Sequence, residues 1–148
     1  MIPIILLFAI AMVVTIRLTH QGMNLATGME NLESIVLTDM NGDQCQLAEL
    51  LTAKKSTFMM LMETDNCPPC IYKGIQDLSA LKKSGHCCFV VVVHNWPDEI
   101  GGWSQNYAFS PFYVLPETSF YRHFNLTHLP VILKLKNRRI KNIRYITN

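Results

Sequence analysis

Two uninterrupted apolar runs, each the length of a buried strand, constrain the fold of this chain most. Residues 56–62 read STFMMLM and residues 88–93 read CFVVVV. Runs of this kind are typical of strands that are covered on both faces. Between them, Ile71, Ile75 and Leu78 recur at helical spacing and form one apolar stripe. A strand, a helix and a second buried strand in this order indicate a parallel crossover.

Shorter elements surround this central unit. The sequence predicts a hairpin around the Asn41-Gly42 turn, because Asn-Gly is a strong signal for a tight turn between strands. The further expected elements are a helical turn over 47–51, a helix over 67–83, a weak helix over 98–107, a strand over 112–115 and a helix over 117–124. The expected fold class is therefore α/β, with a mixed sheet and helices on its faces.

A second hairpin is expected at the end of the chain, with strands over 131–136 and 139–147. Strict alternation in the last strand predicts Ile143 on one face and Ile140 on the other. Six basic residues and no acidic one lie between positions 131 and 148. This run is interpreted as a solvated strand face near an exposed edge, where lysine blunts unwanted pairing. A functional basic patch is the alternative.

Composition sets outer limits on the function. The chain has 148 residues, of which 49% are hydrophobic and 16% charged, with a net charge of +2. Long disordered chains and coiled coils carry more charge, so both classes are excluded. The small net charge gives no reason to expect a nucleic-acid partner.

The apolar excess is concentrated at the N-terminus. Residues 2–16 contain no charged side chain, and Arg17 follows them. We expect an uncleaved signal anchor or transmembrane helix over 1–19, a polar linker over 20–33 and one domain over 34–148. A cleaved signal peptide is the alternative, although no clean cleavage pattern follows the apolar run. An anchor would attach the domain to a membrane, with the domain in the periplasm or another extracytoplasmic space.

Five cysteines are present, and two of them form the motif Cys67-Pro68-Pro69-Cys70. The motif lies between a predicted buried strand and a predicted helix, which puts Cys67 at the helix N-terminus. Backbone N–H groups and the helix dipole favour a thiolate there. Such a thiolate attacks a disulfide, and Cys70, one turn further on, resolves the mixed disulfide. The motif therefore predicts redox chemistry that needs no bound cofactor.

Other uses of the cysteines stay open. A zinc site would need two more ligands, and neither the remaining cysteines nor the histidines have ligand spacing. A purely structural Cys67–Cys70 disulfide would gain little, because the loop it closes is so short. Cys88 is expected in the core as a small hydrophobic residue, and a bond from Cys45 to Cys87 or Cys88 is a further alternative.

Taken together, these residues resemble the thioredoxin superfamily. The motif Cys67-Pro68-Pro69-Cys70 follows a buried strand, and Leu129-Pro130 precedes the closing hairpin. The opening hairpin LTDMNGDQCQLAEL and the N-terminal apolar helix are similar to the membrane-tethered TlpA/ResA-like branch.

The resemblance implies a thioredoxin-like fold with a cis-proline at Pro130 facing the cysteine pair. Leu129, Pro130, Pro68 and Pro69 would shape the substrate site. The implied partners are protein dithiols or disulfides and a membrane or soluble electron donor.

Several positions depart from the family pattern. A tryptophan often precedes the first cysteine, where this chain has Asn66, and a buried aspartate is common where it has Leu61. Glu63 and Asp65 are the candidate proton relay in place of that aspartate. Like-charge repulsion from either would also disfavour the Cys67 thiolate. The family's C-terminal helix has no counterpart after the last strand, so one sheet face is expected to be less covered.

Three histidines are weaker candidates for the site. His94 follows the second buried strand and could relay protons to Cys70, and its alternative role is in a loop or cap. His123 and His128 flank the cis-proline loop and could line the substrate groove.

Two functions from different classes follow from these observations. The first is a thiol-disulfide oxidoreductase that acts on protein disulfides or dithiols through Cys67 and Cys70. The second is a binding module of the same fold, such as a metallochaperone-like maturation factor without redox turnover. The absence of the buried aspartate supports the second.

Overall fold

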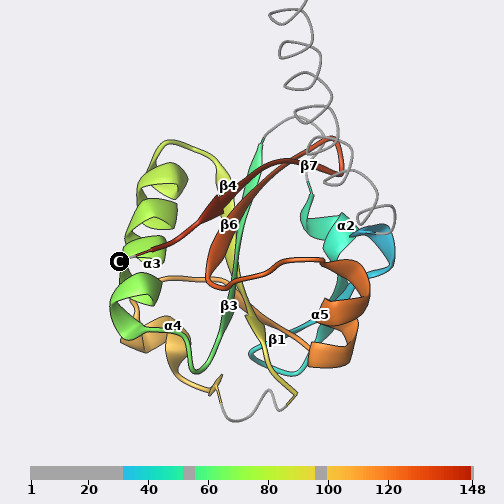
Figure 1. Cartoon of the computed structure of the whole chain (residues 1–148), viewed down its shortest axis with the longest axis horizontal. Coiled ribbons are helices and arrows are strands. Elements are labelled where there is room, and N and C mark those ends of the chain that lie inside the picture. Colours follow the sequence, from blue (N-terminus) through green and yellow to red (C-terminus); the bar gives the residue numbers. More distant parts are fainter. Residues whose placement is uncertain (1–31, 52–55, 96–99, 148) are drawn as a thin grey trace, which may run out of the picture. The chain divides into compact units, whose positions relative to one another are not determined.

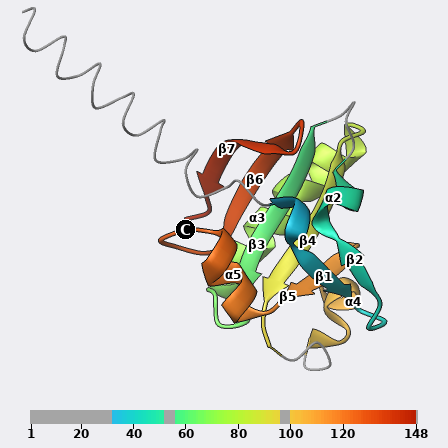
Figure 2. The same cartoon turned by 90° about the vertical axis from the view of Figure 1, so that its right-hand side faces the viewer.

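One seven-stranded sheet organises the part of the chain that the computed structural model describes, residues 32–51, 56–95 and 100–147. The strand order is β2-β1-β5-β4-β3-β6-β7 (Figures 1 and 2). The strands are β1 (Val36–Asp39), β2 (Gln44–Gln46), β3 (Thr57–Glu63), β4 (Cys87–Val93), β5 (Phe112–Leu115), β6 (Val131–Lys136) and β7 (Arg139–Tyr145).

The sheet is mixed, as the sequence predicts. β3, β4 and β5 run parallel, while β6 pairs antiparallel to β3 and β1 pairs antiparallel to β5. The two apolar runs form the adjacent central strands β3 and β4, in register from Thr57 with Cys87 to Glu63 with Val93. The predicted parallel crossover between them is therefore confirmed.

Helices cover both faces of the sheet. They are the 3₁₀ turn η1 (Leu32–Ser34), α2 (Leu47–Leu50), α3 (Pro68–Lys83), α4 (Trp103–Asn106) and α5 (Glu117–His123). Figure 1 shows α3 and α4 on one side of the sheet and α2 and α5 on the other. The predicted helix over 98–107 is shorter than expected, since only Trp103–Asn106 is helical and residues 96–99 lie outside the described residues.

Two hydrophobic cores fill the space between the sheet and these two helix layers. The alternation of side chains along β3 sends Met59 and Leu61 to the core under α5, and Met60 and Met62 to the core under α3. Leu32 is 2% exposed within the α5-side core, so the folded region includes a residue that the sequence assigned to the linker. The methionines of β3 are core residues, as expected of a buried strand.

The closing hairpin contains one correction to the sequence analysis. Leu133 pairs with Ile143, but a register shift between Lys134 and Leu135 makes Leu135 pair with Ile140. Because one residue of β7 is left over at this bulge, Ile140 and Ile143 lie on the same face, against the α5-side core. The prediction of opposite faces is wrong, since it assumed uninterrupted alternation.

The predicted anchor over 1–19, and nearly all of the predicted linker over 20–33, lie outside the described residues. Among the residues that are described, no helix has both the length and the apolar character needed to cross a membrane. Membrane attachment through the N-terminal segment stays a prediction.

Candidate active site

The Cys67-Pro68-Pro69-Cys70 motif forms a disulfide at the N-terminus of α3. Cys67 is bonded to Cys70, with their Cα atoms 5.3 Å apart. Cys67 caps the helix and is exposed, whereas Cys70 lies within the first turn and is 8% exposed. The helix starts here because prolines fit its first turn, where N–H groups have no helical partner. An incoming sulfur therefore reaches Cys67 more easily than Cys70.

The two prolines decide which backbone donor faces the exposed sulfur. Pro68 and Pro69 have no N–H group, so the first N–H of the helix belongs to Cys70. This N–H is shared between two acceptors, the Cys67 carbonyl oxygen at 2.9 Å and the Cys67 Sγ at 3.2 Å. The Ile71 N–H also donates to the Cys67 carbonyl oxygen, across 3.1 Å. A donor aimed at the sulfur, together with the helix dipole, stabilises a thiolate on Cys67 after reduction.

Pro130 lies at the same edge of the sheet as this motif. The Leu129–Pro130 peptide bond is cis, and Pro130 is buried. Val131 pairs with Leu61 near the carboxyl end of β3, so the loop before β6 meets the loop that carries the cysteines. Leu129 is partly buried and packs against the α5-side core. The structure thus places the cysteine motif and the cis-proline loop, which the resemblance implies at the substrate site, at the same edge of the sheet.

Ile146, which the sequence analysis did not identify, contacts the cis-proline loop through a backbone hydrogen bond. The Ile146 N–H donates to the Pro130 carbonyl oxygen across 3.0 Å. The Ile146 side chain in turn reaches α3 at Gly74, where a Cβ atom would find no space between Ile146 and Met60. A glycine on the buried face of a helix was the available signal, because glycine there permits a close approach.

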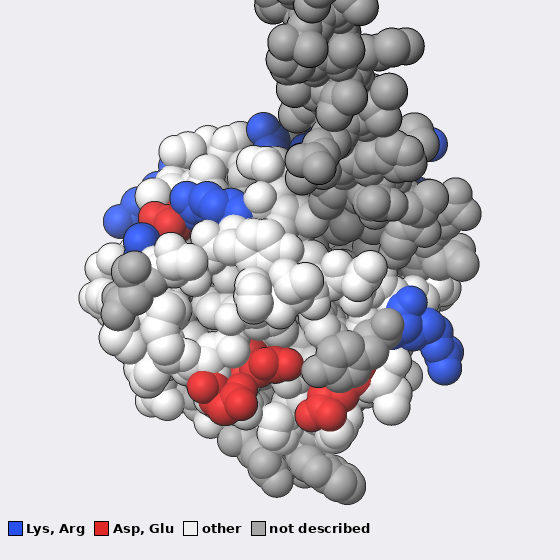
Figure 3. Space-filling view, viewed as in Figure 1, with Lys and Arg blue, Asp and Glu red and all other residues white. Residues whose placement is uncertain are grey.

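Three carboxylates lie near the cysteine motif. The pKa of Glu63 is raised, first by burial and then by the negative charges of Asp65 and Glu117. The hydrogen bond with Asn66 works in the opposite direction, and the Asn66 Oδ1 also accepts the Glu63 backbone N–H across 2.8 Å. Figure 3 shows acidic side chains gathered in the lower part of the molecule, near the ends of β3 and α5. A raised pKa suits Glu63 to accept and release a proton, whereas Asp65 is exposed.

The position expected for a buried acid is apolar. Leu61 is fully buried in the α5-side core, on the face of β3 opposite α3. The carboxylate on β3 that lies nearest to Leu61 is therefore Glu63, which is partly buried and lies two residues after Leu61 on the same face of the strand.

The three histidines occupy different places. His94 directly follows β4, whose last residue Val93 pairs with Glu63, so it lies at the carboxyl edge of the sheet. His128 is exposed and its ring contacts Tyr145 edge-on, at 6.2 Å between centroids. His123 ends α5 and is partly buried, and burial together with the Arg122 charge lowers its pKa.

The remaining cysteines are free thiols, so the expected alternative of a bond from Cys45 to Cys87 or Cys88 is wrong. Cys88 lies in the α3-side core as predicted, and burial raises its pKa to about 11. Cys87 donates a weak hydrogen bond to the Leu50 carbonyl oxygen at 3.8 Å. Burial also raises the pKa of Cys45. Burial therefore disfavours nucleophilic attack by Cys45 and Cys88.

The described residues contain no cluster of three or more His, Cys, Asp or Glu side chains arranged to hold a metal ion. The zinc site considered from the sequence therefore has no counterpart among them.

No protein-family model matches this sequence, and no curated protein matches it. Solved structures do resemble it. A thioredoxin-like protein from Porphyromonas gingivalis superposes with a TM-score of 0.62 at 19% identity, over 79% of this chain and 81% of the other. A secreted disulfide oxidoreductase of Mycobacterium tuberculosis gives 0.58 at 13% identity, over 77% and 84%. BsSco, a member of the Sco family of cytochrome c oxidase assembly proteins, gives 0.58 at 12%, over 79% and 84%.

These identities are low, so the likeness concerns the fold. It agrees with the mixed sheet and the parallel crossover that the chain's own residues predict. The chain has a thioredoxin-like α/β fold with a Cys67–Cys70 disulfide at the N-terminus of α3.

Proposed function

We propose that this protein is a thiol-disulfide oxidoreductase that acts on protein disulfides or dithiols. One observation carries the proposal: an exposed Cys67 sulfur, bonded to the buried Cys70, accepts the first N–H of a helix across 3.2 Å. This arrangement makes Cys67 the nucleophile and leaving thiolate, and keeps Cys70 for the internal step.

The exchange needs only the two sulfurs and a proton acceptor. In the reducing direction, the Cys67 thiolate attacks one sulfur of a substrate disulfide and forms a mixed disulfide, and the other substrate sulfur leaves as a thiolate. Cys70 then loses its proton and attacks the Cys67 Sγ, which releases the second substrate thiolate and forms the Cys67–Cys70 disulfide. Two electrons move from the protein to the substrate, and the opposite direction reverses each step.

Glu63 is the proposed acceptor of the Cys70 proton. Its raised pKa supports this role, because a carboxylate with a pKa nearer neutrality takes up and returns a proton more readily. Asp65 would act mainly through its charge, which adds to the raised pKa of Glu63.

The substrate chain is proposed to lie across Pro68, Pro69 and the Leu129–Pro130 peptide. The two spacer prolines are exposed beside Cys67, and the cis-proline loop flanks the motif. A peptide bound there would present its disulfide to Cys67.

The membrane-tethered TlpA/ResA-like subtype remains part of the proposal. The apolar residues 2–16 support attachment through an N-terminal helix, with the domain on the extracytoplasmic side where disulfide exchange is common. A membrane or soluble dithiol protein would then return the electrons.

A binding or maturation factor without redox turnover is the second candidate. It is supported by Leu61, which puts a fully buried apolar side chain where a proton acceptor is expected. In this case the cysteine pair would serve as a switch or a ligand rather than as a turnover catalyst.

A redox titration of the full chain in glutathione buffers, combined with an assay of disulfide exchange on a protein substrate, separates the two candidates. We expect one reversible two-electron transition, which is monitored by the alkylation mass shift on Cys67 and Cys70. We also expect Cys67→Ala to abolish disulfide exchange with a protein substrate, while Cys45→Ala leaves it unchanged. No reversible transition, or no disulfide exchange by the parent protein, would contradict the proposed function and favour the binding factor. Exchange that survives Cys67→Ala would contradict the role of Cys67 as the nucleophile.

A further inference from the structure

A groove lies between α3 and the closing hairpin. The only described helices on this side of the sheet are α3 and α4 (Figure 1). α3 packs on β3 and β4, and α4 contacts β5 through Trp103 and Phe112. Arg144 of β7 reaches Asp77 of α3, and a pocket of about 450 Å³ opens beside α3 over β6 and β7.

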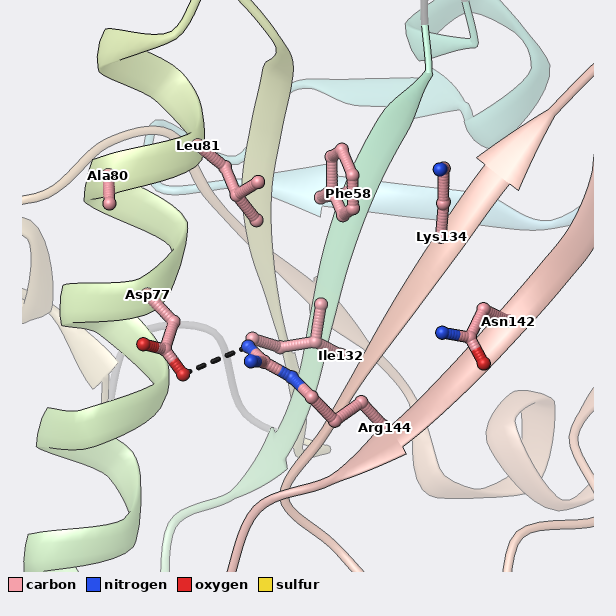
Figure 4. A pocket seen from close by; sticks show the side chains of 8 residues that line it. All are labelled: Phe58, Asp77, Ala80, Leu81, Ile132, Lys134, Asn142 and Arg144. Atoms are coloured by element: carbon pink, nitrogen blue, oxygen red, sulfur yellow. Dashed lines mark ion pairs between the residues drawn. The ribbon is translucent and has the colours of Figure 1, made fainter.

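The floor of this groove is apolar. Phe58 of β3, Leu81 of α3 and Ile132 of β6 line it (Figure 4). Phe58 and Leu81 are only partly buried, although both belong to the margin of the α3-side core. Apolar side chains at the edge of a core are stabilised when a further element covers them.

The rim of the groove is basic. The Lys134 Nζ lies 5.8 Å from the centre of the Phe58 ring, at one side of the floor. Alternation along β6 and the pairing with β7 place Lys136, Arg139 and Arg144 on the same sheet face as Lys134. Figure 3 shows basic side chains gathered over α3 and the neighbouring end of β7.

Only one acid faces these cations within the pocket. Asp77 of α3 is the sole acidic residue among the described residues that line it, and its Oδ2 lies 2.9 Å from an Arg144 guanidinium nitrogen (Figure 4). The Arg144 side chain is 51% exposed and that of Asp77 is 39% exposed. An ion pair so open to water is weak, so Arg144 can exchange Asp77 for another carboxylate at little cost.

We propose that this groove docks an acidic amphipathic helix of a partner protein. A helix is the element that completes a layer beside α3, because sheet faces are covered by helices packed side by side. Its apolar stripe would cover Phe58 and Leu81, which are only partly buried, and its carboxylates would meet the basic side chains of the rim. The charge excess of the groove selects against basic partners. This docking does not involve the Cys67 sulfur, so it stands independently of the proposed redox activity.

The test uses the full chain in mild detergent and a fluorescent peptide as probe. The probe set consists of designed helical peptides of about three to four turns, with a leucine stripe and glutamates on both flanks. A peptide of the same composition in scrambled order, which has no apolar stripe, is the matched probe. Anionic lipid nanodiscs report on the competing possibility of a membrane surface. Binding is followed by fluorescence anisotropy at low and at moderate salt.

We expect saturable binding of the amphipathic peptides, stronger than that of the scrambled peptide and weaker at the higher salt concentration. The reversal Lys134→Glu should weaken binding about tenfold, while Arg122→Glu, on α5 across the sheet, should change it little. Asp77→Asn, which frees Arg144, should strengthen binding, and loss of folding cannot produce such a gain. Cys67→Ala should bind as the parent does.

Three results would overturn the docking proposal. The first is an absence of binding by every amphipathic peptide. The second is equal weakening by Lys134→Glu and Arg122→Glu. The third is lipid binding that depends on Lys134 while the peptides do not bind, which would assign the face to a membrane.

Discussion

The replacement Gly74→Ala tests whether helix packing sets the position of the cis-proline loop. An alanine Cβ at this site would lie 2.5 Å from the Ile146 Cδ1 and 2.7 and 2.8 Å from the Cε and Sδ of Met60. Ordinary carbon contacts lie at about 3.5–4.0 Å, so both side chains would have to withdraw by roughly 1 Å.

Two opposing contributions decide the sign of the stability change. Alanine gains up to about 1 kcal/mol over glycine inside a helix. Overpacking a filled core costs about 1–3 kcal/mol. Met60 is fully buried and Ile146 is 8% exposed, so both side chains would have to move within the core rather than into solvent. We expect a net destabilisation of about 1 kcal/mol, which lowers the melting temperature by about 4 °C in a domain of this size.

Thermal and urea unfolding of the full chain in mild detergent measure this change. The control Ala80→Gly, at an exposed position of the same helix, reports the helix-propensity contribution alone. The double variant with Met60→Val should recover part of the loss if crowding is its cause. Because Ile146 donates to the Pro130 carbonyl oxygen, we also expect slower exchange with protein disulfides but unchanged reduction by dithiothreitol. A Gly74→Ala protein that is more stable than the parent by the full propensity gain would refute the reasoning.

Three further predictions concern buried polar and titratable groups. For Glu63→Gln, we expect a higher free energy of unfolding than in the parent at about pH 7 and no gain at about pH 4. Because the pKa of Glu63 is raised in the folded state, its ionised form destabilises the fold only as the pH rises through that pKa. Urea unfolding at the two pH values checks this. Equal gains at both pH values would contradict it. For Thr57→Val, we expect stabilisation by about 1 kcal/mol, because the buried Thr57 Oγ1 has no hydrogen-bond partner among the described residues. A loss of stability would show that the hydroxyl does make a hydrogen bond in the folded protein. In the reduced native protein, we expect iodoacetamide to label Cys67 at about pH 8 and to leave Cys88 unlabelled until the protein unfolds. The reason is that burial raises the pKa of Cys88 to about 11. Mass spectrometry identifies the labelled cysteines, and labelling of Cys88 before unfolding would count against its burial.

Most of the sheet could be predicted because its strands carry local signals. The runs at β3 and β4 are apolar throughout, and the stripe on α3 repeats at helical spacing, so hydrophobic burial alone specifies the central crossover. The bulge in β7 could not be predicted, because it arises from pairing with β6 rather than from the composition of β7. Ile140 consequently lies on the face opposite to the one that alternation predicts.

Part of the candidate site could likewise be predicted from the sequence, and part could not. The cysteine motif was identified from residue type and order, and Pro130 from the resemblance to the thioredoxin superfamily. The structure places both at one edge of the sheet. The support of Pro130 by Ile146 was not predicted, since it joins residues that only the fold brings together.

Residue type and periodicity were enough to identify the cysteine pair and to specify the centre of the fold. Residue type decides which groups can exchange disulfides, and periodicity decides which segments bury apolar surface. Which faces of those segments stay open depends instead on tertiary packing. The groove beside α3 and the close approach at Gly74 arise where elements distant in the chain meet, because contact between them is set by three-dimensional geometry rather than by local propensity.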